Sequence, residues 1–242
     1  MNLGRHVIER QREAQHSGFM ANQTTTLSIA SRFLAQPAPR VQAAVLVLAA
    51  GARVFSATRG HALTWGDAAV AAGLAVAMPF VEWVVHSRVL HAKPIRWRGR
   101  ALVLAATRAH AAHHADPRDE SRIVTPLPAL LPLLPVMAAA AILPTWALRA
   151  SAVAVLSLLV LSTEWVHFLV HAQPTPKSTW LRGRSRAHRL HNYRNEHYWF
   201  GLTSGLADSV LGTAPSRDGA PARNTRGLYP PVIRAEGRSA LG

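Results

Sequence analysis

The sequence from residue 123 to residue 148 holds no charged side chain and no histidine over 26 consecutive positions. A helix needs about 20 apolar residues to cross the hydrocarbon core of a bilayer, so this segment is long enough to span a membrane. Four prolines between Pro126 and Pro135 predict a kinked or irregular first half, which is tolerated only where other protein covers the freed backbone groups. We expect this segment to be the clearest membrane span.

Three further apolar segments predict additional spans. Residues 150–170 would return across the membrane after a turn near Arg149, and residues 67–85 form an alanine-rich candidate. Residues 41–55 are a weaker candidate, because the segment is short for a crossing and carries Arg53. The expected fold class is all-α and integral to the membrane, with about four transmembrane helices in two hairpins and a histidine-rich helical cap.

The basic residues are distributed unevenly along the chain. Of the 27 lysines and arginines, five lie in residues 1–40, eight in residues 86–122 and eleven in residues 171–242. Cytoplasmic loops of membrane proteins carry an excess of Lys and Arg, so we expect these regions, and both termini, on the cytoplasmic side of a bacterial inner membrane.

The same pattern predicts the domain organisation. Residues 1–40 read as a polar N-terminal segment and residues 41–215 as a membrane-embedded domain. Residues 216–242 are rich in Pro, Gly, Ser and Arg, with little periodic hydrophobicity, which predicts a disordered basic tail.

Composition excludes several functional classes. A net charge of +15 would suit a nucleic-acid-binding protein, but 49% hydrophobic residues and the apolar hairpins would then be unexplained, so we expect no nucleic-acid partner. The chain has no cysteine, which excludes disulfides, zinc ribbons, iron–sulfur clusters and thiol nucleophiles. Any bound metal must therefore be held by histidine or carboxylate.

Nine of the 13 histidines fall into four groups, all on the predicted cytoplasmic side. The groups are His86 with His91, His110 with His113 and His114, His167 with His171, and His188 with His191. Neutral imidazoles that lie close together stabilise a protein little, and protonated ones repel each other. A divalent cation can bind several neutral imidazoles at once, which makes their closeness favourable. His6, His16, His61 and His197 have no partner at ligand spacing and are expected to be ordinary surface or core residues.

The spacing within each group predicts how the rings point. Residues three or four apart share one face of a helix, so His110, His113 and His114 are expected to aim in one direction. The two later pairs, spaced by four and three residues, follow the same logic. His86 and His91 are five residues apart, so the helix must end or bend between them.

The number of histidines predicts two metal ions. Nine candidates exceed the three or four protein ligands of one zinc or non-haem iron site. Soluble di-iron bundles use glutamates from four helices and two Glu-x-x-His elements, but here only Glu164 with His167 supplies such an element. The pattern favours a histidine-dominated site at a membrane surface.

The ordered set of histidine motifs resembles the fatty acid hydroxylase superfamily of membrane oxygenases, which includes sterol desaturases and carotenoid hydroxylases. The matching elements are the His86-x4-His91 pair, HxxHH at 110–114, the His167-x3-His171 pair and HxxH at 188–191, with hydrophobic hairpins before and between them. Residues 195–213, NEHYWFGLTSGLADSVLGT, resemble the closing motif of that family. The resemblance covers residues 80–215.

The resemblance implies a di-metal oxygenase. Two metal ions, usually iron, with zinc as the other candidate, would activate dioxygen to attack an unactivated C–H bond of a lipid substrate. The chain has no room for a fused cytochrome or flavin domain and no GxGxxG after a strand, so a separate electron-donor protein is implied. Fatty acyl, sterol and carotenoid substrates, and hydroxylation or desaturation, all stay open, with the FGLTS segment favouring the fatty acid hydroxylase branch.

Asn192 departs from the family pattern. The last cluster of the family reads HxxHH, but here it reads HRLHN, with Asn192 in the place of the final histidine. An amide oxygen can ligate a hard cation, although it is a poorer donor than imidazole for iron or zinc. Two hypotheses follow: an oxygenase that holds one metal more weakly, or a catalytically impaired or non-catalytic metal-binding protein of the same fold.

Three carboxylates are candidates to orient the metal-binding imidazoles. Glu82, Glu164 and Asp208 are placed to accept the second N–H of a ligating ring and so fix its tautomer. For Glu82 and Glu164, the alternative is a charge at a helix end that reaches water. Asp208 lies where the closing motif of the family has its aspartate.

Overall fold

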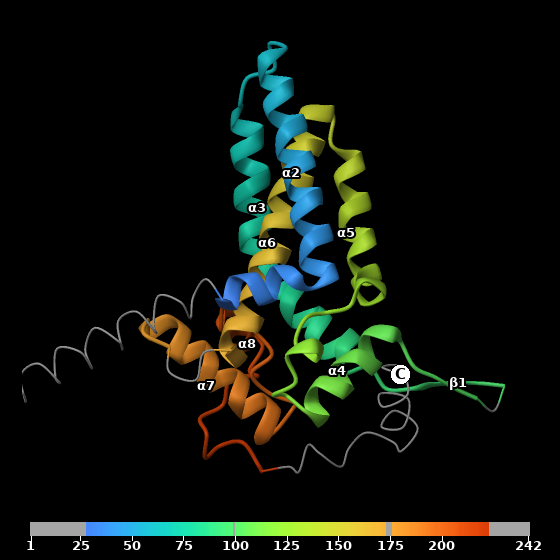
Figure 1. Ribbon diagram of the computed structural model, residues 1–242, viewed down its shortest axis with the longest axis vertical. Helices are drawn as coiled ribbons and strands as arrows, with labels where there is room; N and C mark the ends of the chain where they lie inside the picture. Colours follow the sequence, from blue (N-terminus) through green and yellow to red (C-terminus); the bar gives the residue numbers. More distant parts are fainter. Residues whose placement is uncertain (1–27, 99, 173–175, 223–242) are drawn as a thin grey trace, which may run out of the picture.

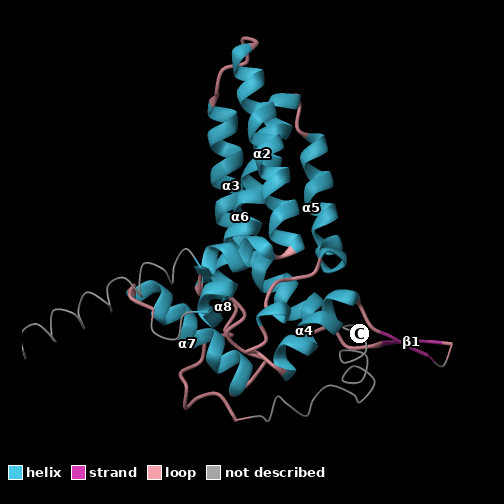
Figure 2. Ribbon diagram, in the orientation of Figure 1, coloured by secondary structure: helices cyan, strands magenta, loops and turns pink. Residues whose placement is uncertain are grey.

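The computed structural model describes residues 28–98, 100–172 and 176–222 (Figure 1). The expectations for residues 1–27 and for the tail after residue 222 lie outside the described residues. The fold is a bundle of long helices that stands on a cap of shorter elements, and helices predominate throughout (Figure 2). The structure confirms an all-α integral membrane protein.

Three helices of the described residues are long and apolar enough to cross a membrane. They are α2 (Pro37–Thr58), α3 (Trp65–Val84) with the π-helix η1 (Val85–Leu90) that continues it, and α6 (Trp146–Ala172). The weakest sequence candidate, residues 41–55, is therefore a full-length helix. Its flanking residues, from Pro37 onwards, extend it to 22 residues.

The segment expected to be the clearest span does not form one continuous helix. It consists of the 3-10 helix η3 (Leu127–Leu133), the short helix α5 (Leu134–Ala139) and the 3-10 helix η4 (Ala140–Ile142). Proline lacks the N–H that an α-helix needs and clashes with the preceding turn, which explains why the proline-rich half is irregular. Met137 of α5 packs against the buried cluster of Met78, Leu156 and Val160 from α3 and α6, so protein covers part of this segment.

The cap holds the remaining elements. After η1 the chain forms a two-stranded hairpin, then a helix that carries HxxHH, and later two helices near the C-terminal end. These elements are β1 (Ile95–Trp97), β2 (Arg100–Leu102), α4 (Ala105–Ala115), the 3-10 helix η2 (Glu120–Arg122), α7 (Thr179–Tyr193) and α8 (Leu206–Val210). The strands pair antiparallel, with Ile95 opposite Leu102.

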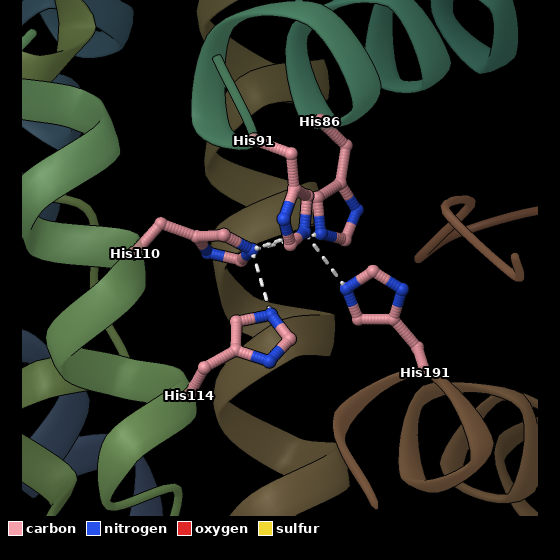
Figure 3. Close-up of side chains that lie close together, drawn as sticks. All are labelled: His86, His91, His110, His114 and His191. Carbon is pink, nitrogen blue, oxygen red and sulfur yellow. Dashed lines mark hydrogen bonds between the residues drawn. The ribbon is translucent and has the colours of Figure 1, made fainter. Parts of the chain in front are cut away.

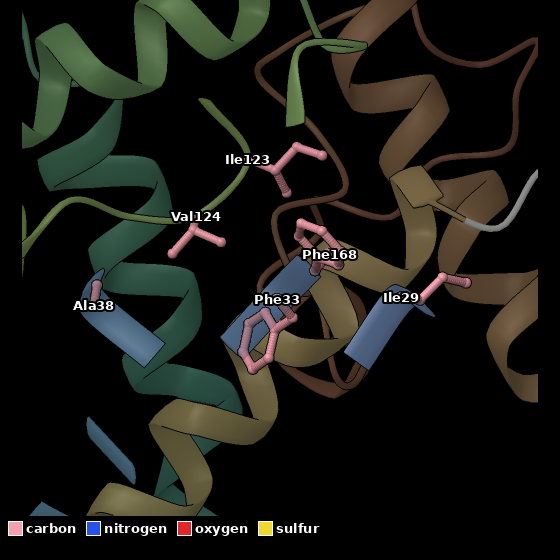
Figure 4. Packing of buried hydrophobic residues seen from close by; sticks show 6 residues of the cluster. All are labelled: Ile29, Phe33, Ala38, Ile123, Val124 and Phe168. Carbon is pink, nitrogen blue, oxygen red and sulfur yellow. The ribbon is translucent and has the colours of Figure 1, made fainter. Parts of the chain in front are cut away.

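A hydrophobic core joins the bundle to the cap. Phe168 of α6 is fully buried among Ile123 and Val124 of the loop after η2 (Figure 4). Ile29 and Phe33, which lie in the helical residues 28–35, complete this core. Three residues of the expected polar N-terminal segment, Ile29, Phe33 and Ala38, thus pack in the same core as Phe168, while the domain boundaries stay a prediction.

A buried ion pair ties three helices together near the tip of the bundle. Arg53 of α2 donates from Nε to Asp67 Oδ1 at 2.9 Å and to Ser151 Oγ at 3.0 Å. Asp67 also accepts from Ser151 Oγ at 2.5 Å and forms a capping box with Thr64 at the start of α3. Because the Arg53 charge is paired and hydrogen-bonded, α2 can carry it within a membrane span.

Arg53→Met is expected to lower the unfolding temperature of the detergent-solubilised protein by several degrees. The substitution keeps the apolar stem but leaves the Asp67 carboxylate buried without its cation, which is destabilising. Arg59→Met is the matched control, because Arg59 is exposed just after α2. Thermal unfolding followed by tryptophan fluorescence measures both. Equal unfolding temperatures for the two variants would show that the ion pair contributes nothing to the fold.

Candidate metal centre

A π-helical turn brings His86 and His91 together. The His91 N–H donates to the His86 carbonyl at 3.2 Å, an i→i+5 bond that is the mark of the π-helix. The wider turn aligns residues five apart, and the two ring centroids lie 5.3 Å from each other. The helix ends at Leu90, so it ends between the two histidines, which is one of the two arrangements predicted from their spacing.

Helix α4 does not aim its three histidines in one direction. His110 and His114 face one group of rings, whereas His113 faces another. Each residue of an α-helix is rotated by about 100° from the one before, so His113 and His114 point to clearly different sides. The expectation of a single direction was therefore wrong, and α4 lies between two separate groups.

The nine histidines predicted from the sequence meet in two groups. Within each group one nitrogen per ring lies within 4.8 Å of the others, so each could hold a metal ion. Helix α7 also contributes to both groups, with His188 in one and His191 in the other. Group A contains His86, His91, His110, His114 and His191 (Figure 3), and group B contains His113, His167, His171 and His188.

In group A, the ring nitrogens converge on one point. His110 Nε2 lies 3.1 Å from His86 Nε2, 3.0 Å from His91 Nε2 and 3.0 Å from His114 Nε2 (Figure 3). The single N–H of neutral His86 lies on Nδ1, where it donates to the Phe200 carbonyl, so its Nε2 can only accept. If His110 Nε2 donates to it, that nitrogen cannot also accept from His91 and His114, so the three contacts cannot all be hydrogen bonds. Two nitrogens that share one ion at about 2.1 Å are separated by about 3.0–3.4 Å at octahedral or tetrahedral angles. The donor set of group A therefore fits a cation.

Group B shows the same convergence with fewer rings. His188 Nε2 lies 3.2 Å from His167 Nε2 and 2.8 Å from His171 Nε2. Asn192, on the next turn of α7, is 1% exposed, and its amide nitrogen lies 3.1 Å from His188 Nε2 and 3.4 Å from His113 Nε2. The side chain at the departing position thus lies against group B.

Burial keeps the rings of the cap neutral. It lowers the pKa of His110 and of His188 well below the usual range, and the neighbouring imidazoles lower it further. A neutral ring has a lone pair on one nitrogen, which is the form that binds a metal ion. Burial therefore favours the neutral imidazoles that can coordinate a metal ion over charged imidazolium groups.

Two backbone carbonyls fix the orientation of rings in group A. His86 Nδ1 donates to the Phe200 carbonyl at 2.6 Å, and His191 Nδ1 donates to the Tyr198 carbonyl at 2.8 Å. Glu196 Oε2 lies 3.9 Å from His91 Nδ1. Sequence reasoning missed the two carbonyls, because every residue has one and residue type does not reveal its direction. It also missed the Glu196 carboxylate, although all three residues belong to the closing motif.

The three carboxylates proposed to orient imidazoles contact other groups. Glu82 accepts from the hydroxyls of Thr163 and Thr203, each at 2.6 Å. Glu164 accepts from the Thr125 N–H at 3.0 Å. Among the contacts of the described residues, neither carboxylate meets an imidazole N–H; both tie loops to the helices.

Asp208 is connected to a histidine through the backbone. Its carboxylate accepts from the Phe200 N–H at 3.0 Å and from the Gly201 N–H at 2.7 Å. Phe200 is the residue whose carbonyl holds His86. Asp208 thus reaches His86 through one peptide unit rather than by direct contact.

An apolar cavity adjoins both groups. Its wall contains His86 and His110 of group A and His113 and His167 of group B. The rest of the wall comes from α3, η1, α4 and α6, from the segment that runs from η2 into η3, and from residues 200–202 after α7. Its apolar members include Met78, Val81, Val85, Ala109, Val124, Leu130, Val160 and Phe200. The cavity connects the bundle interior with both sets of imidazoles.

Comparisons with known proteins match this site. The family model described as fatty acid hydroxylase matches residues 71–213, which is more than half of the chain and includes all nine grouped histidines. Dihydroceramide fatty acyl 2-hydroxylase FAH1 of Arabidopsis thaliana is 30% identical over 148 residues, which cover 57% of this chain and 56% of that protein. FAH2 of the same plant is 27% identical over 158 residues, 59% of this chain and 61% of that protein.

A solved structure shares the fold. It is described as full-length scs7p with only the hydroxylase domain visible, and it superposes with a TM-score of 0.60 at 23% identity. The match covers 77% of this chain and 68% of that chain. This chain spans about three fifths of the length of the two plant relatives.

Proposed function

Because the chain belongs to the fatty acid hydroxylase family, we propose that it is a membrane-bound, two-metal oxygenase that hydroxylates the acyl chain of a lipid. The observation that carries the proposal is the apolar cavity, whose wall includes histidines of both groups. A hydrocarbon chain in this cavity would have its C–H bonds next to both metal positions.

The chain supplies binding and position, and the metals supply reactivity. Group A and group B would each hold one ion, iron in our proposal, and when bound the two ions provide the activation of dioxygen. The reaction inserts one oxygen atom into a C–H bond, and the other leaves as water with two electrons and two protons. The apolar wall binds the acyl chain and excludes bulk water from the reacting carbon.

The proposed substrate is a long-chain fatty acyl lipid. Both plant relatives are named as dihydroceramide fatty acyl 2-hydroxylases, which act near the carboxyl end of an acyl chain. The cavity suits such a chain, because Met78, Leu130 and Val160 extend its lining towards the bundle. A hydroxylated product, rather than a new double bond, is what the relatives favour.

The reaction needs electrons from outside the chain. We propose a separate electron-donor protein that meets the cap. The described lysines and arginines are concentrated in the cap, whereas Arg59 and Arg149 lie towards the other end of the bundle. This distribution supports a metal centre on the cytoplasmic side of the membrane, which we propose to be a bacterial inner membrane.

Labelled dioxygen tests the proposed reaction. The full chain, expressed in a bacterial host under isotopically labelled dioxygen, is expected to yield acyl lipids that carry one labelled oxygen on the chain. His113→Ala should abolish the product, because His113 belongs to group B and lines the cavity. His197→Ala is the matched control, since His197 is exposed and belongs to neither group.

Each other outcome has a distinct meaning. A lipid that loses two hydrogens without gaining oxygen would establish desaturation instead. An unchanged lipid profile from a protein that holds both ions would establish the non-catalytic alternative, which the presence of Asn192 against group B favours.

A further inference from the structure

Residues 198–200 turn two backbone carbonyls towards two histidines from different parts of the chain. The Phe200 carbonyl accepts from His86 Nδ1 of η1, and the Tyr198 carbonyl accepts from His191 Nδ1 of α7. These two rings lie side by side in group A, with centroids 4.5 Å apart. One short segment therefore controls two of the five rings.

The two bonds decide which nitrogen of each ring carries the proton. A carbonyl can only accept, so Nδ1 must hold the hydrogen in both rings and Nε2 must present a lone pair. Both Nε2 atoms face other nitrogens of group A, at 3.1 Å from His110 and from His91 respectively. Without the carbonyls, each neutral ring would be free to place its proton on Nε2, where it blocks coordination.

The residue between Tyr198 and Phe200 has a backbone conformation that residues with a side chain rarely adopt. Trp199 has a φ of 57°, in the left-handed region, although it is neither glycine nor asparagine. Such a conformation persists only where the surroundings over-determine it, and it occurs preferentially at functional sites. The turn at Trp199 bends the chain between the Tyr198 and Phe200 carbonyls.

Several buried contacts hold this turn in place. The Trp199 N–H donates to the Thr213 carbonyl at 2.8 Å, and its indole Nε1 donates to the Pro215 carbonyl at 3.2 Å. On the other side, Asp208 accepts from the N–H groups of Phe200 and Gly201 and from the Thr213 hydroxyl at 2.6 Å. Asp208 is 2% exposed, so these bonds do not compete with water.

The segment also has no room to relax around Gly201. A Cβ at this position would lie 2.0 Å from the Ser204 carbonyl oxygen and 3.0 Å from Asp208 Oδ2. The chain after Phe200 is therefore packed against its own turn. Trp83 of α3 adds a contact from the bundle, because its Nε1 donates to the Thr213 hydroxyl at 2.9 Å.

We propose that Trp199 is a positioning residue: its turn, which Asp208 holds through the Phe200 and Gly201 N–H groups, sets the proton placement of His86 and His191 and thereby the affinity of group A for its metal ion. The inference rests on the proposed function only in its premise that group A binds a metal. Groups that orient metal ligands typically contribute 10–100-fold to metal affinity, and that is the size of effect expected here.

A matched pair of substitutions separates the backbone turn from the indole. Asn and Val are both much smaller than Trp and both remove the indole, but Asn tolerates the left-handed region, whereas a β-branched residue such as Val does not. Trp199→Val should weaken ion binding by about 10–100-fold, and Trp199→Asn should recover most of that loss. Asp208→Asn should also weaken binding, because an amide offers one acceptor oxygen where two N–H groups and a hydroxyl donate.

The measurement uses the full chain in detergent, in a His167→Ala/His171→Ala background that removes two histidines of group B. Competition for Zn²⁺ against a chromophoric chelator gives the affinity of group A, and the Co²⁺ absorption spectrum reports its ligand geometry. Size-exclusion chromatography and thermal unfolding identify any variant that has lost its fold. If Trp199→Val is unfolded, Asp208→Asn is compared with the parent instead.

Three results would overturn the proposal. Equal affinities for the parent, Trp199→Val and Asp208→Asn would show that the carbonyls do not matter. Equal losses in Trp199→Val and Trp199→Asn would assign the effect to the indole and not to the turn. A background protein that binds no Zn²⁺ or Co²⁺ would remove the premise that group A is a metal site, and this failure is distinguishable from the other two.

Discussion

Replacing His110 with alanine is expected to remove the ion of group A and to abolish lipid hydroxylation. His110 is the ring that three others surround, with its Nε2 at 3.0–3.1 Å from the nitrogens of His86, His91 and His114. Removing a group that only orients a metal ligand already reduces activity by about 10–100-fold. Removing the ligand itself should therefore reduce activity by more than about 100-fold. Metal content by mass spectrometry and product formation in the same preparation measure both effects.

His197→Ala provides the control for His110→Ala. It makes the same chemical change in the same cap, but at an exposed ring that belongs to neither group. We expect full metal content and full activity from it. A His110→Ala protein that kept both ions and its activity would contradict the assignment of group A as a metal centre.

Substitutions at Asn192 are expected to change the affinity of group B in a graded order. The side-chain amide of Asn192 lies against His188 and His113. A 180° flip of this amide places its oxygen where its nitrogen now lies, next to both rings. Asn192→Asp keeps the shape and adds a negative charge, so it should tighten ion binding by at least about tenfold. Asn192→Leu keeps a similar shape without a donor atom and should weaken binding by about tenfold.

Metal titration of the parent protein, Asn192→Asp and Asn192→Leu tests whether the affinity of group B falls in the order Asp, Asn, Leu at this position. Asn195→Leu is the matched control, because Asn195 is 1% exposed but donates to the Pro221 carbonyl and belongs to neither group. It should leave the affinity of group B unchanged. Equal affinities across the Asn192 series would mean that the amide is no ligand and that group B relies on its four histidines alone.

The spans show where sequence reasoning succeeds and where it fails. Apolar composition identified α3 and α6, because the bilayer demands long runs of apolar residues whatever the tertiary contacts. Composition undervalued α2, since the Arg53 charge is compensated by Asp67 and Ser151, which are distant in the sequence. Composition also favoured residues 123–148 as the clearest span, but there the prolines prevent one continuous helix despite the apolar sequence.

The candidate site divides in the same way. All nine histidines could be selected from their spacing, because local periodicity is a property of the sequence. Their division between two groups could not, since neighbours such as His113 and His114 join different groups only because rings from other helices approach α4 on two sides. The assignment of Asn192 to group B has the same origin.

Residue types and their order along the chain thus determined that this is a helical membrane protein with histidines suited to metals. The three-dimensional packing alone decided which imidazoles meet, which cavity they adjoin and which carbonyls orient them. The physical reason is that ligand chemistry and periodicity are local, whereas convergence depends on the relative placement of η1, α4, α6 and α7. The carbonyls of Tyr198 and Phe200 illustrate the limit most clearly, because every residue has a carbonyl and only the fold gives these two a direction.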